Sequence, residues 1–342
     1  MKKVTAVVVA LIMLASLVAC GKETPTTTKA NAETSGTQQQ EKLVLRLGFT
    51  NNEEHPNYLA SKQFADAVAE RTNGQIEIQL APNSLLGGEK DLAEGMTLGT
   101  VEMALLGTGG MRVYDDNMQL FFLPFLFNSR EAAYKVLDGE IGKEISAMME
   151  SKAPVKILAY YENGYRHITN SVKAIYTPED LKGLKIRTPE IPALVATFKG
   201  LGANPTPMAF GELFTAMQQK TVDGQENPLV TIISSKFYEV QKYCSLTGHV
   251  WDPFALTIST AAWNKITPEN QAIVQEEAKK AADYQRSLCI KADEEGIEQL
   301  KALGCEVNEV DLAVWQEATK FVYDEYAEQF GKELIEKIRA VH

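Results

Sequence analysis

A long run of helical patterning constrains this chain more than any other feature. It begins at Thr267-Pro268-Glu269, where a threonine can cap a helix, a proline suits the first helical position and an acid lies in the first turn. The pattern persists to Gly304. At about 1.5 Å per residue, an unbroken helix of this length would exceed roughly 50 Å, which is more than the width of a small domain. We therefore expect a strut that runs along two domains, with a kink or break at Gly296.

Short strands and helices alternate in the first half of the chain. Large apolar residues occupy every second position from Leu43 to Phe49, as in a strand with one buried face. Alternation of this kind favours an α/β sheet with parallel strand pairs. The pattern predicts strands at residues 43–49, 76–80 and 101–106, and helices at residues 57–71 and 89–98.

A similar unit recurs further along. Thr177-Pro178 begins a helix by the same capping logic as Thr267-Pro268. Residues 42–342 together are about twice as long as a typical domain, so two domains are expected. The pattern predicts strands at residues 155–161, 185–187, 222–226 and 307–310, and helices at residues 210–220 and within 312–340.

The first 42 residues are expected to direct export rather than to fold. Residues 1–20 combine a charged start, an apolar run and a small residue before Cys20, which is the order of a secretory signal. Leu-Val-Ala-Cys at 17–20 resembles a bacterial lipobox, and the resemblance implies lipidation of Cys20. The alternative is an ordinary signal whose cysteine is incidental. Residues 21–42 are polar and are expected to form a disordered tether.

Several function classes are disfavoured by what the sequence lacks. The net charge of −11 without a basic cluster argues against nucleic acid as a partner. No nucleophile elbow, phosphate loop or zinc helix is present, so no cofactor or metal is expected. Cys244, Cys289 and Cys305 are an odd number and are expected to be buried thiols. A glycosidase-like pair of carboxylates stays open, because such pairs need only proximity in space.

Arg187 is the most informative single residue. It ends a short strand immediately before Thr188-Pro189, and ligands of open α/β sheets bind beyond the carboxyl ends of strands. A guanidinium at such a point can bind a carboxylate through two parallel hydrogen bonds. Asn227, at another strand end before a proline, could complete the carboxylate's shell or hold Arg187. On spacing alone, a surface ion pair is the favoured alternative for Arg187.

Ordered motifs make the chain resemble a known family. They are Asn-Ser-Leu-Leu-Gly at 83–87, Leu-Pro-Phe at 123–125, Gly-Leu-Lys-Ile-Arg-Thr-Pro at 183–189, Pro-Thr-Pro-Met-Ala-Phe at 205–210, Val-Asp-Gly-Gln-Glu-Asn-Pro at 222–228 and Phe-Tyr-Glu-Val-Gln-Lys-Tyr at 237–243. Together they are similar to the solute-binding proteins of TRAP (tripartite ATP-independent periplasmic) transporters. The likeness extends from Leu43 to the end of the chain.

The resemblance implies a two-domain periplasmic-binding-protein-like α/β fold. A ligand cleft would lie between the domains, and the long helix would span both. We place domain I at residues 43–164 plus 253–292 and domain II at residues 165–252 plus 293–342. The implied mechanism is hinge closure around a small organic acid, followed by recognition of the closed form by the membrane permease subunits. No chemistry on the ligand, and hence no enzyme activity, is expected.

The resemblance also assigns roles to residues. Arg187 corresponds to the family's carboxylate-clamping arginine and Asn227 to its asparagine partner. Arg166 falls where a second arginine often reaches the acid group, and Phe210 looks like the aromatic residue that packs on the ligand. Asn51 and Glu89 fall where polar residues of the first domain contact the rest of the solute.

One departure from the family bears on the ligand. Gly107 and Gly110 stand where sialate-binding members carry an acid and an arginine, which argues against sialic acid. The space, together with Glu89, suits a hydroxylated monocarboxylate such as a hexuronate. The alternatives are a C4-dicarboxylate or keto acid in the same system, a sensory or scaffold binding protein, and a secreted hydrolase of sugar acids. Trp251 and Asp252 are further cleft candidates, with core packing favoured for Trp251.

Overall fold

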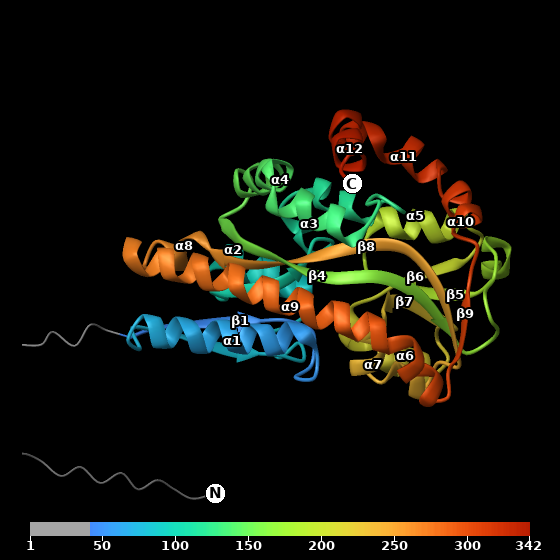
Figure 1. Ribbon diagram of the computed structural model, residues 1–342, viewed down its shortest axis with the longest axis horizontal. Helices are drawn as coiled ribbons and strands as arrows, with labels where there is room; N and C mark the ends of the chain where they lie inside the picture. Colours follow the sequence, from blue (N-terminus) through green and yellow to red (C-terminus); the bar gives the residue numbers. More distant parts are fainter. Residues whose placement is uncertain (1–41) are drawn as a thin grey trace, which may run out of the picture. The chain divides into compact units, whose positions relative to one another are not determined.

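The computed structural model describes residues 42–342. The predicted signal at residues 1–20, Cys20 and nearly all of the predicted tether lie outside the described residues. Nine strands form one mixed sheet in the order β2-β1-β3-β8-β4-β7-β5-β6, and β9 pairs with β8 (Figure 1). Within residues 42–342, no helix is both long enough and apolar enough to cross a bilayer.

One end of the sheet is built from what we call the first strand group. Its strands are parallel, as predicted, and helices that begin at recognisable caps connect them. The side chain of His55 accepts a hydrogen bond from the backbone of Asn57 at the start of the first helix, and a proline follows the cap. The group comprises β1 (Leu43–Gly48), β2 (Ile76–Ala81), β3 (Met103–Gly107), α1 (Pro56–Arg71) and α2 (Glu89–Leu98).

The other end is the second strand group, in which β5 pairs in parallel with β6 and β7. The helix predicted at residues 210–220 is present as a 3-10 turn followed by a shorter α-helix. The helix predicted at Thr177 is limited to the single turn η3. The group comprises β5 (Lys185–Thr188), β6 (Asn204–Pro207), β7 (Gly224–Pro228), α5 (Pro192–Gly200), η4 (Phe210–Glu212), α6 (Leu213–Gln218) and α7 (Leu229–Ser234).

Two long antiparallel strands join the groups. β4 (Val155–Asn170) pairs with β7 and β8, and β8 (Tyr243–Ser259) pairs with β3 and β4. The register of the β4–β8 pair shifts between Glu162 and Gly164 and again between Arg166 and Ile168. Such bulges bend a strand locally and increase its twist. Both strands therefore bend where they pass from one group to the other.

The predicted strut is the 35-residue helix α9 (Pro268–Ala302). It packs on α1 of the first group and on α7 of the second (Figure 1). The prediction of a break at Gly296 is wrong, because the helix continues through it. Gly296 is buried, and a Cβ there would lie 3.2 Å from the Cβ of Leu229. The glycine therefore allows α9 and α7 to approach closely.

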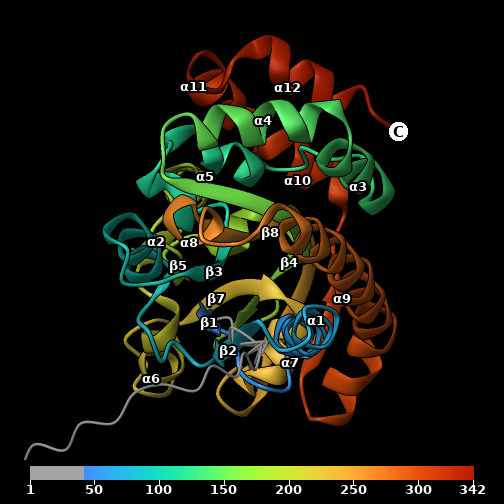
Figure 2. The same cartoon turned by 90° about the vertical axis from the view of Figure 1, so that its left-hand side faces the viewer.

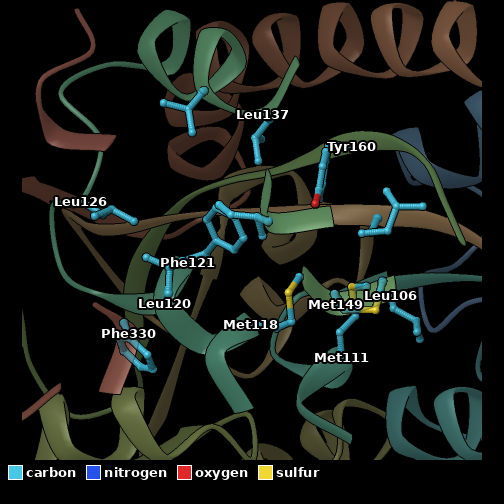
Figure 3. Packing of buried hydrophobic residues seen from close by; sticks show 14 of the residues in the cluster. Leu106, Met111, Met118, Leu120, Phe121, Leu126, Leu137, Met149, Tyr160 and Phe330 are labelled. Atoms are coloured by element: carbon cyan, nitrogen blue, oxygen red, sulfur yellow. The ribbon is translucent and has the colours of Figure 1, made fainter. Parts of the chain in front are cut away.

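The remaining helices cover the sheet and close its main core. Figure 3 shows part of that core, where Leu106, Met111, Phe121 and Tyr160 pack together and Phe330 is contributed by a C-terminal helix. Cys244, Cys289 and Cys305 are buried free thiols, as predicted. The elements not yet placed are α3 (Arg130–Asp138), α4 (Glu140–Glu150), α8 (Thr260–Trp263), α10 (Leu312–Ala318), α11 (Phe321–Phe330), α12 (Lys332–Arg339), β9 (Glu306–Glu309), η1 (Gly110–Val113), η2 (Asp116–Phe122), η3 (Pro178–Leu181) and η5 (Phe237–Glu239).

The buried cap His55 predicts a pH-dependent contribution to stability. Burial lowers the pKa of His55 to about 3, whereas an unfolded histidine titrates near 6.5. Between pH 6 and pH 4, His55 binds a proton in the unfolded chain but stays neutral in the folded protein. Its contribution to the free energy of unfolding therefore falls by about 1.4 kcal/mol for each pH unit of acidification. Replacing His55 by Asn keeps a capping side chain and removes that proton. The free energy of unfolding of His55→Asn minus that of wild type should therefore increase by about this amount for each unit by which the pH falls.

Urea unfolding at several pH values between 7 and 4 would measure the difference. Comparison with wild type is needed because burial raises the pKa of Asp252 and Asp293 to about 6, which stabilises the fold as the pH falls. Thr267→Ala is the control, because Thr267 caps α9 and has no titratable group. Its cost should be the same at every pH. A slope for His55→Asn as flat as the control's would contradict the prediction.

Candidate functional site

A cavity of about 770 Å³ lies between the two strand groups. Its wall includes all six residues singled out from the sequence as ligand-binding candidates, together with Gly107, Gly110 and Asp252. The six come from separate elements of both groups and are brought to one place by the fold. They are Asn51, Glu89, Arg166, Arg187, Phe210 and Asn227.

Arg187 lies near the end of β5 and is 3% exposed. Its Nε and Nη2 donate hydrogen bonds to the backbone oxygen of Met208, at 3.1 and 2.8 Å. Within residues 42–342, no carboxylate lies within 4 Å of this guanidinium. Burial lowers the pKa of Arg187 to about 10, which reflects the cost of an unpaired charge in the interior. The alternative of a surface ion pair is therefore wrong.

Arg166 is also buried, but it is fully paired. Its Nε lies 2.5 Å and its Nη2 2.7 Å from the carboxylate of Glu226, and its Nη1 lies 3.2 Å from Asp252. Burial acts to lower the pKa of Arg166, but these two carboxylates outweigh it and raise the pKa. Asn163 donates to both oxygens of Asp252. Arg166 is thus held by two acids before any ligand arrives.

The two predicted asparagines occupy opposite walls. The side chain of Asn227 accepts from Nη2 of Arg166 at 3.3 Å and donates to Gln225, so it holds Arg166 rather than Arg187. Asn51 accepts a hydrogen bond from Asn57, while its own amide nitrogen has no protein partner among residues 42–342. That amide is therefore a donor available to a ligand.

Glu89 begins α2 and points onto two glycines. Its Oε1 accepts a hydrogen bond from the backbone of Gly107 at 3.0 Å. A Cβ at Gly107 would lie 2.9 Å from Oε1, and one at Gly110 would lie 2.7 Å from the Cβ of Glu89. The space left by the glycines is thus filled by the Glu89 carboxylate. Burial raises the pKa of Glu89, against the opposing effects of the Gly107 backbone and the two arginines.

Aromatic residues complete the wall. Phe210 lies at the start of η4 and packs on Phe237, with ring centroids 5.9 Å apart. Phe122 lies under Arg166, whose guanidinium carbon is 5.9 Å from the ring centroid. Trp251 is in the main core beside Phe127, as favoured from the sequence, and does not line the cavity.

The cavity wall contains one cation without an acidic partner in the described chain. Lys90, Arg112 and Arg166 each lie within 4 Å of a carboxylate, whereas Arg187 does not. A larger cavity of about 1060 Å³ lies on the other face of β4, lined by Tyr165 and His167. Its mostly buried cation, Arg130, is already paired with Glu162 and Asp293, and its Arg339, which has no carboxylate partner among residues 42–342, is exposed to solvent. The smaller cavity is therefore the better candidate for an anion.

Three residues of this wall or its surroundings were not predicted. Asn163 and Glu226 orient Asp252 and Arg166, and Arg112 lines the rim. Glu226 lies within the Gln-Glu-Asn-Pro motif, which was the available signal. The local sequence around Asn163 and Arg112 gives no comparable signal.

Comparisons with known proteins match most of the chain. Residues 47–329 match the family described as bacterial extracellular solute-binding protein, family 7. The chain is 40% identical over 263 residues to the 2,3-diketo-L-gulonate-binding periplasmic protein of Escherichia coli, covering 77% of this chain and 80% of that protein.

Solved structures share the fold. A TRAP periplasmic solute binding protein of a Polaromonas species, bound to D-erythronate, is 39% identical with a TM-score of 0.85, covering 88% of this chain and 99% of that one. Another from Roseobacter denitrificans, with bound L-galactonate, is 35% identical with a TM-score of 0.83, covering 87% and 99%. The predicted two-domain α/β fold class is confirmed.

The two arginines should differ in their effect on stability. Arg166→Met leaves the buried Glu226 and Asp252 without their cation, which should cost about 3–5 kcal/mol. Arg187→Met removes a buried charge that has no acidic partner in the described part of the chain, so it should change stability by less than about 1 kcal/mol or increase it. Urea unfolding of both variants, freed of bound solute by unfolding and refolding, would measure this. Equal losses in the two variants would contradict the prediction.

Proposed function

The chain belongs to the family of bacterial extracellular solute-binding proteins, family 7, which serve TRAP transporters, and we propose that its solute is a hydroxylated monocarboxylate. The preferred class is a sugar acid such as a hexuronate. The observation that carries this proposal is the buried guanidinium of Arg187, which has hydrogen-bond donors but no acidic partner among residues 42–342.

A carboxylate would complete the surroundings of Arg187. Met208 uses Nε and one Nη2 hydrogen, so Nη1 and the second Nη2 hydrogen can bind both oxygens of an acid group. The charge would then be paired inside the cavity, which offsets the cost of its burial. Arg166 would attract the acid group mainly through the electrostatic field of its positive charge, because its own hydrogen-bond donors already contact Glu226 and Asp252.

The far wall favours hydroxyl groups over a second carboxylate. The Glu89 carboxylate can accept hydrogen bonds from hydroxyls, while it would repel a second anionic group. The free amide nitrogen of Asn51 could donate to a hydroxyl or carbonyl oxygen. The three relatives named above bind or hold 2,3-diketo-L-gulonate, D-erythronate and L-galactonate, which are all hydroxylated acids with one carboxylate.

We further propose that the solute is enclosed by hinge closure without being chemically changed. The bends of β4 and β8 lie beside Asn163, Arg166 and Asp252, so a change in strand curvature would move the walls relative to each other. Residues 43–164 plus 253–292 would move as domain I, and residues 165–252 plus 293–342 as domain II. The closed form would then dock on the permease subunits.

The first residues of the chain support a proposal about where the protein acts. We propose that residues 1–20 direct export and that Cys20 is lipidated, so that residues 21–42 tether the domains to the outer face of a membrane. Mass spectrometry of the mature protein would test the lipid directly. A mature N-terminus that is not a lipid-modified Cys20 would contradict it.

A panel of acids tests the proposed solute class. Hexuronates, aldonates, keto acids, C4-dicarboxylates and sialate would be compared with neutral sugars by thermal shift. An acid at a hundred times its Kd should stabilise the protein by about 2.7 kcal/mol. We expect the shift to be selective for a hydroxylated monocarboxylate and absent in Arg187→Met, because the acid group would lose its cation.

The controls separate loss of binding from loss of folding. Arg46→Ala removes an arginine paired with Glu102 on the surface of the first strand group and should bind like wild type. No shift with any acid, from wild type freed of solute and shown to be folded, would contradict the proposal. So would turnover of a sugar acid or its conjugate by the wild-type protein.

The role of Glu89 gives a separate prediction about dicarboxylates. Glu89→Gln keeps an oxygen for the Gly107 backbone but removes the negative charge. Affinity for a C4-dicarboxylate such as succinate should rise by about tenfold or more, equivalent to about 1.4 kcal/mol. Because burial raises the pKa of Glu89, acidification should produce part of the same gain in wild type and none in the variant. Isothermal titration at several pH values would measure both effects, and unchanged succinate affinity would contradict the role.

A further inference from the structure

Arg112 makes a hydrogen bond across the cleft. It lies on η1, directly after β3 of the first strand group. Its Nη1 donates to the backbone oxygen of Glu190, at 3.1 Å, in the segment that follows β5 of the second group. Its Nε lies 3.0 Å from Asp116, which orients the guanidinium. The contact therefore joins the two groups only three residues after Arg187.

This contact lies on the side of the cleft away from the strut. Figure 2 shows α2 and α5 on the side of the sheet opposite α9. η1 packs on α2, and Glu190 precedes α5. On the α9 side, the groups are joined by other contacts, from Asn52 to the Ser234 backbone at 2.7 Å and between His55 and Thr231 at 3.2 Å. Arg112 thus contacts the second group at the edge that α9 does not cover.

Close packing accompanies the hydrogen bond. A Cβ at Gly109 would lie 2.1 Å from Cδ1 and 2.7 Å from Cγ1 of Ile191, so a larger residue there would require the Ile191 side chain to shift. Gly109–Ile191 and Arg112–Glu190 are adjacent pairs across the same edge. Both would separate if the two groups moved apart at this edge.

Arg112 also forms part of the wall that separates two neighbouring cavities. The side chain lines the candidate site and a neighbouring cavity of about 850 Å³. Glu190 and Pro207 are shared by the two walls in the same way. Truncation of Arg112 would therefore remove both the cross-cleft bond and part of the wall between the cavities.

We propose that Arg112 is a positioning residue that latches the closed cleft over the bound acid. The proposal rests on the solute-binding function proposed above. The latch bond forms only when the two groups are together, so it stabilises the closed complex and slows its opening. It contributes little to the first encounter of the acid with Arg187. Arg112 therefore sets the residence time of the solute.

The latch is tested by measuring the association and dissociation rate constants of the acid separately. The probe is D-galacturonate, or L-galactonate if that acid gives the larger thermal shift. In stopped-flow measurements, Arg112→Ala should raise the dissociation rate constant by about tenfold, in keeping with loss of one hydrogen bond from a charged donor. The association rate constant should stay within about twofold. Arg112→Lys, which can still donate to the Glu190 oxygen, should restore part of the slow dissociation, and Arg46→Ala should match wild type.

A distance measurement distinguishes a latch from direct contact with the acid. Spin labels at Leu98→Cys and Lys199→Cys, in a Cys20→Ser background, would report the separation of α2 and α5, since both residues are exposed. At saturating probe, Arg112→Ala should show a larger open fraction than the unsubstituted labelled protein. A group that only contacts the acid would leave the distance distribution at saturation unchanged.

The outcomes separate the latch from the proposed function. One outcome is that Arg187→Met does not bind the acid while Arg112→Ala shows wild-type rate constants and wild-type label distances. That outcome would overturn the latch and leave the solute-binding function standing. A fall in the association rate constant alone would also overturn the latch. Wild-type protein that binds no acid of the panel would overturn the proposed function, and the latch with it.

Discussion

Two buried arginines in the cavity wall share the nearby acids unequally, and the proposed binding of a carboxylate depends on that inequality. Within residues 42–342, Arg166 takes the carboxylates of Glu226 and Asp252, and Arg187 is left with a backbone oxygen alone. An unpaired guanidinium in the interior is unfavourable, and the fold retains it because β5 and its pairing with β6 fix the backbone that carries it. The pairing of Arg166 is thus what makes Arg187 available. Under the proposed function, stability at Arg166 and ligand binding at Arg187 therefore depend on each other.

The strands β4 and β8 connect the two strand groups and also contribute side chains to the wall of the site, in a part that we call its floor. β4 carries Asn163 and Arg166, and β8 carries Asp252, at the places where the register of the pair shifts. A solute that contacts this floor therefore contacts the segment that bends. α9 passes beside it as an uninterrupted helix, so the proposed closure would move the opposite edge of the cleft more than the edge beside α9.

Local patterns predicted the elements whose signals are local. Thr267-Pro268 marked the start of α9, and alternation marked β1 and β2. β8 was not predicted, because it is buried along most of its length and shows little alternation. Gly296 was misread as a break, since a glycine for close helix packing looks the same in sequence.

Some features of the candidate site could likewise be predicted from local sequence and others could not. The resemblance to a family singled out six residues that the fold does place in one wall, whereas the pairing of Arg166 depends on residues 60 and 86 positions away. No local pattern contains such a pairing. Nor could spacing tell that Asn227 would hold Arg166 rather than Arg187.

The seating of Glu89 on Gly107 and Gly110 has an evolutionary consequence. A side chain at Gly110 would meet the Cβ of Glu89, which rotation of Glu89 cannot move aside, and one at Gly107 would meet its carboxylate. The three positions therefore form an epistatic unit. A side chain acquired at position 107 would require the Glu89 carboxylate to move aside, and one acquired at position 110 would require the start of α2 to shift. A change of solute class through these positions should therefore involve all three residues together.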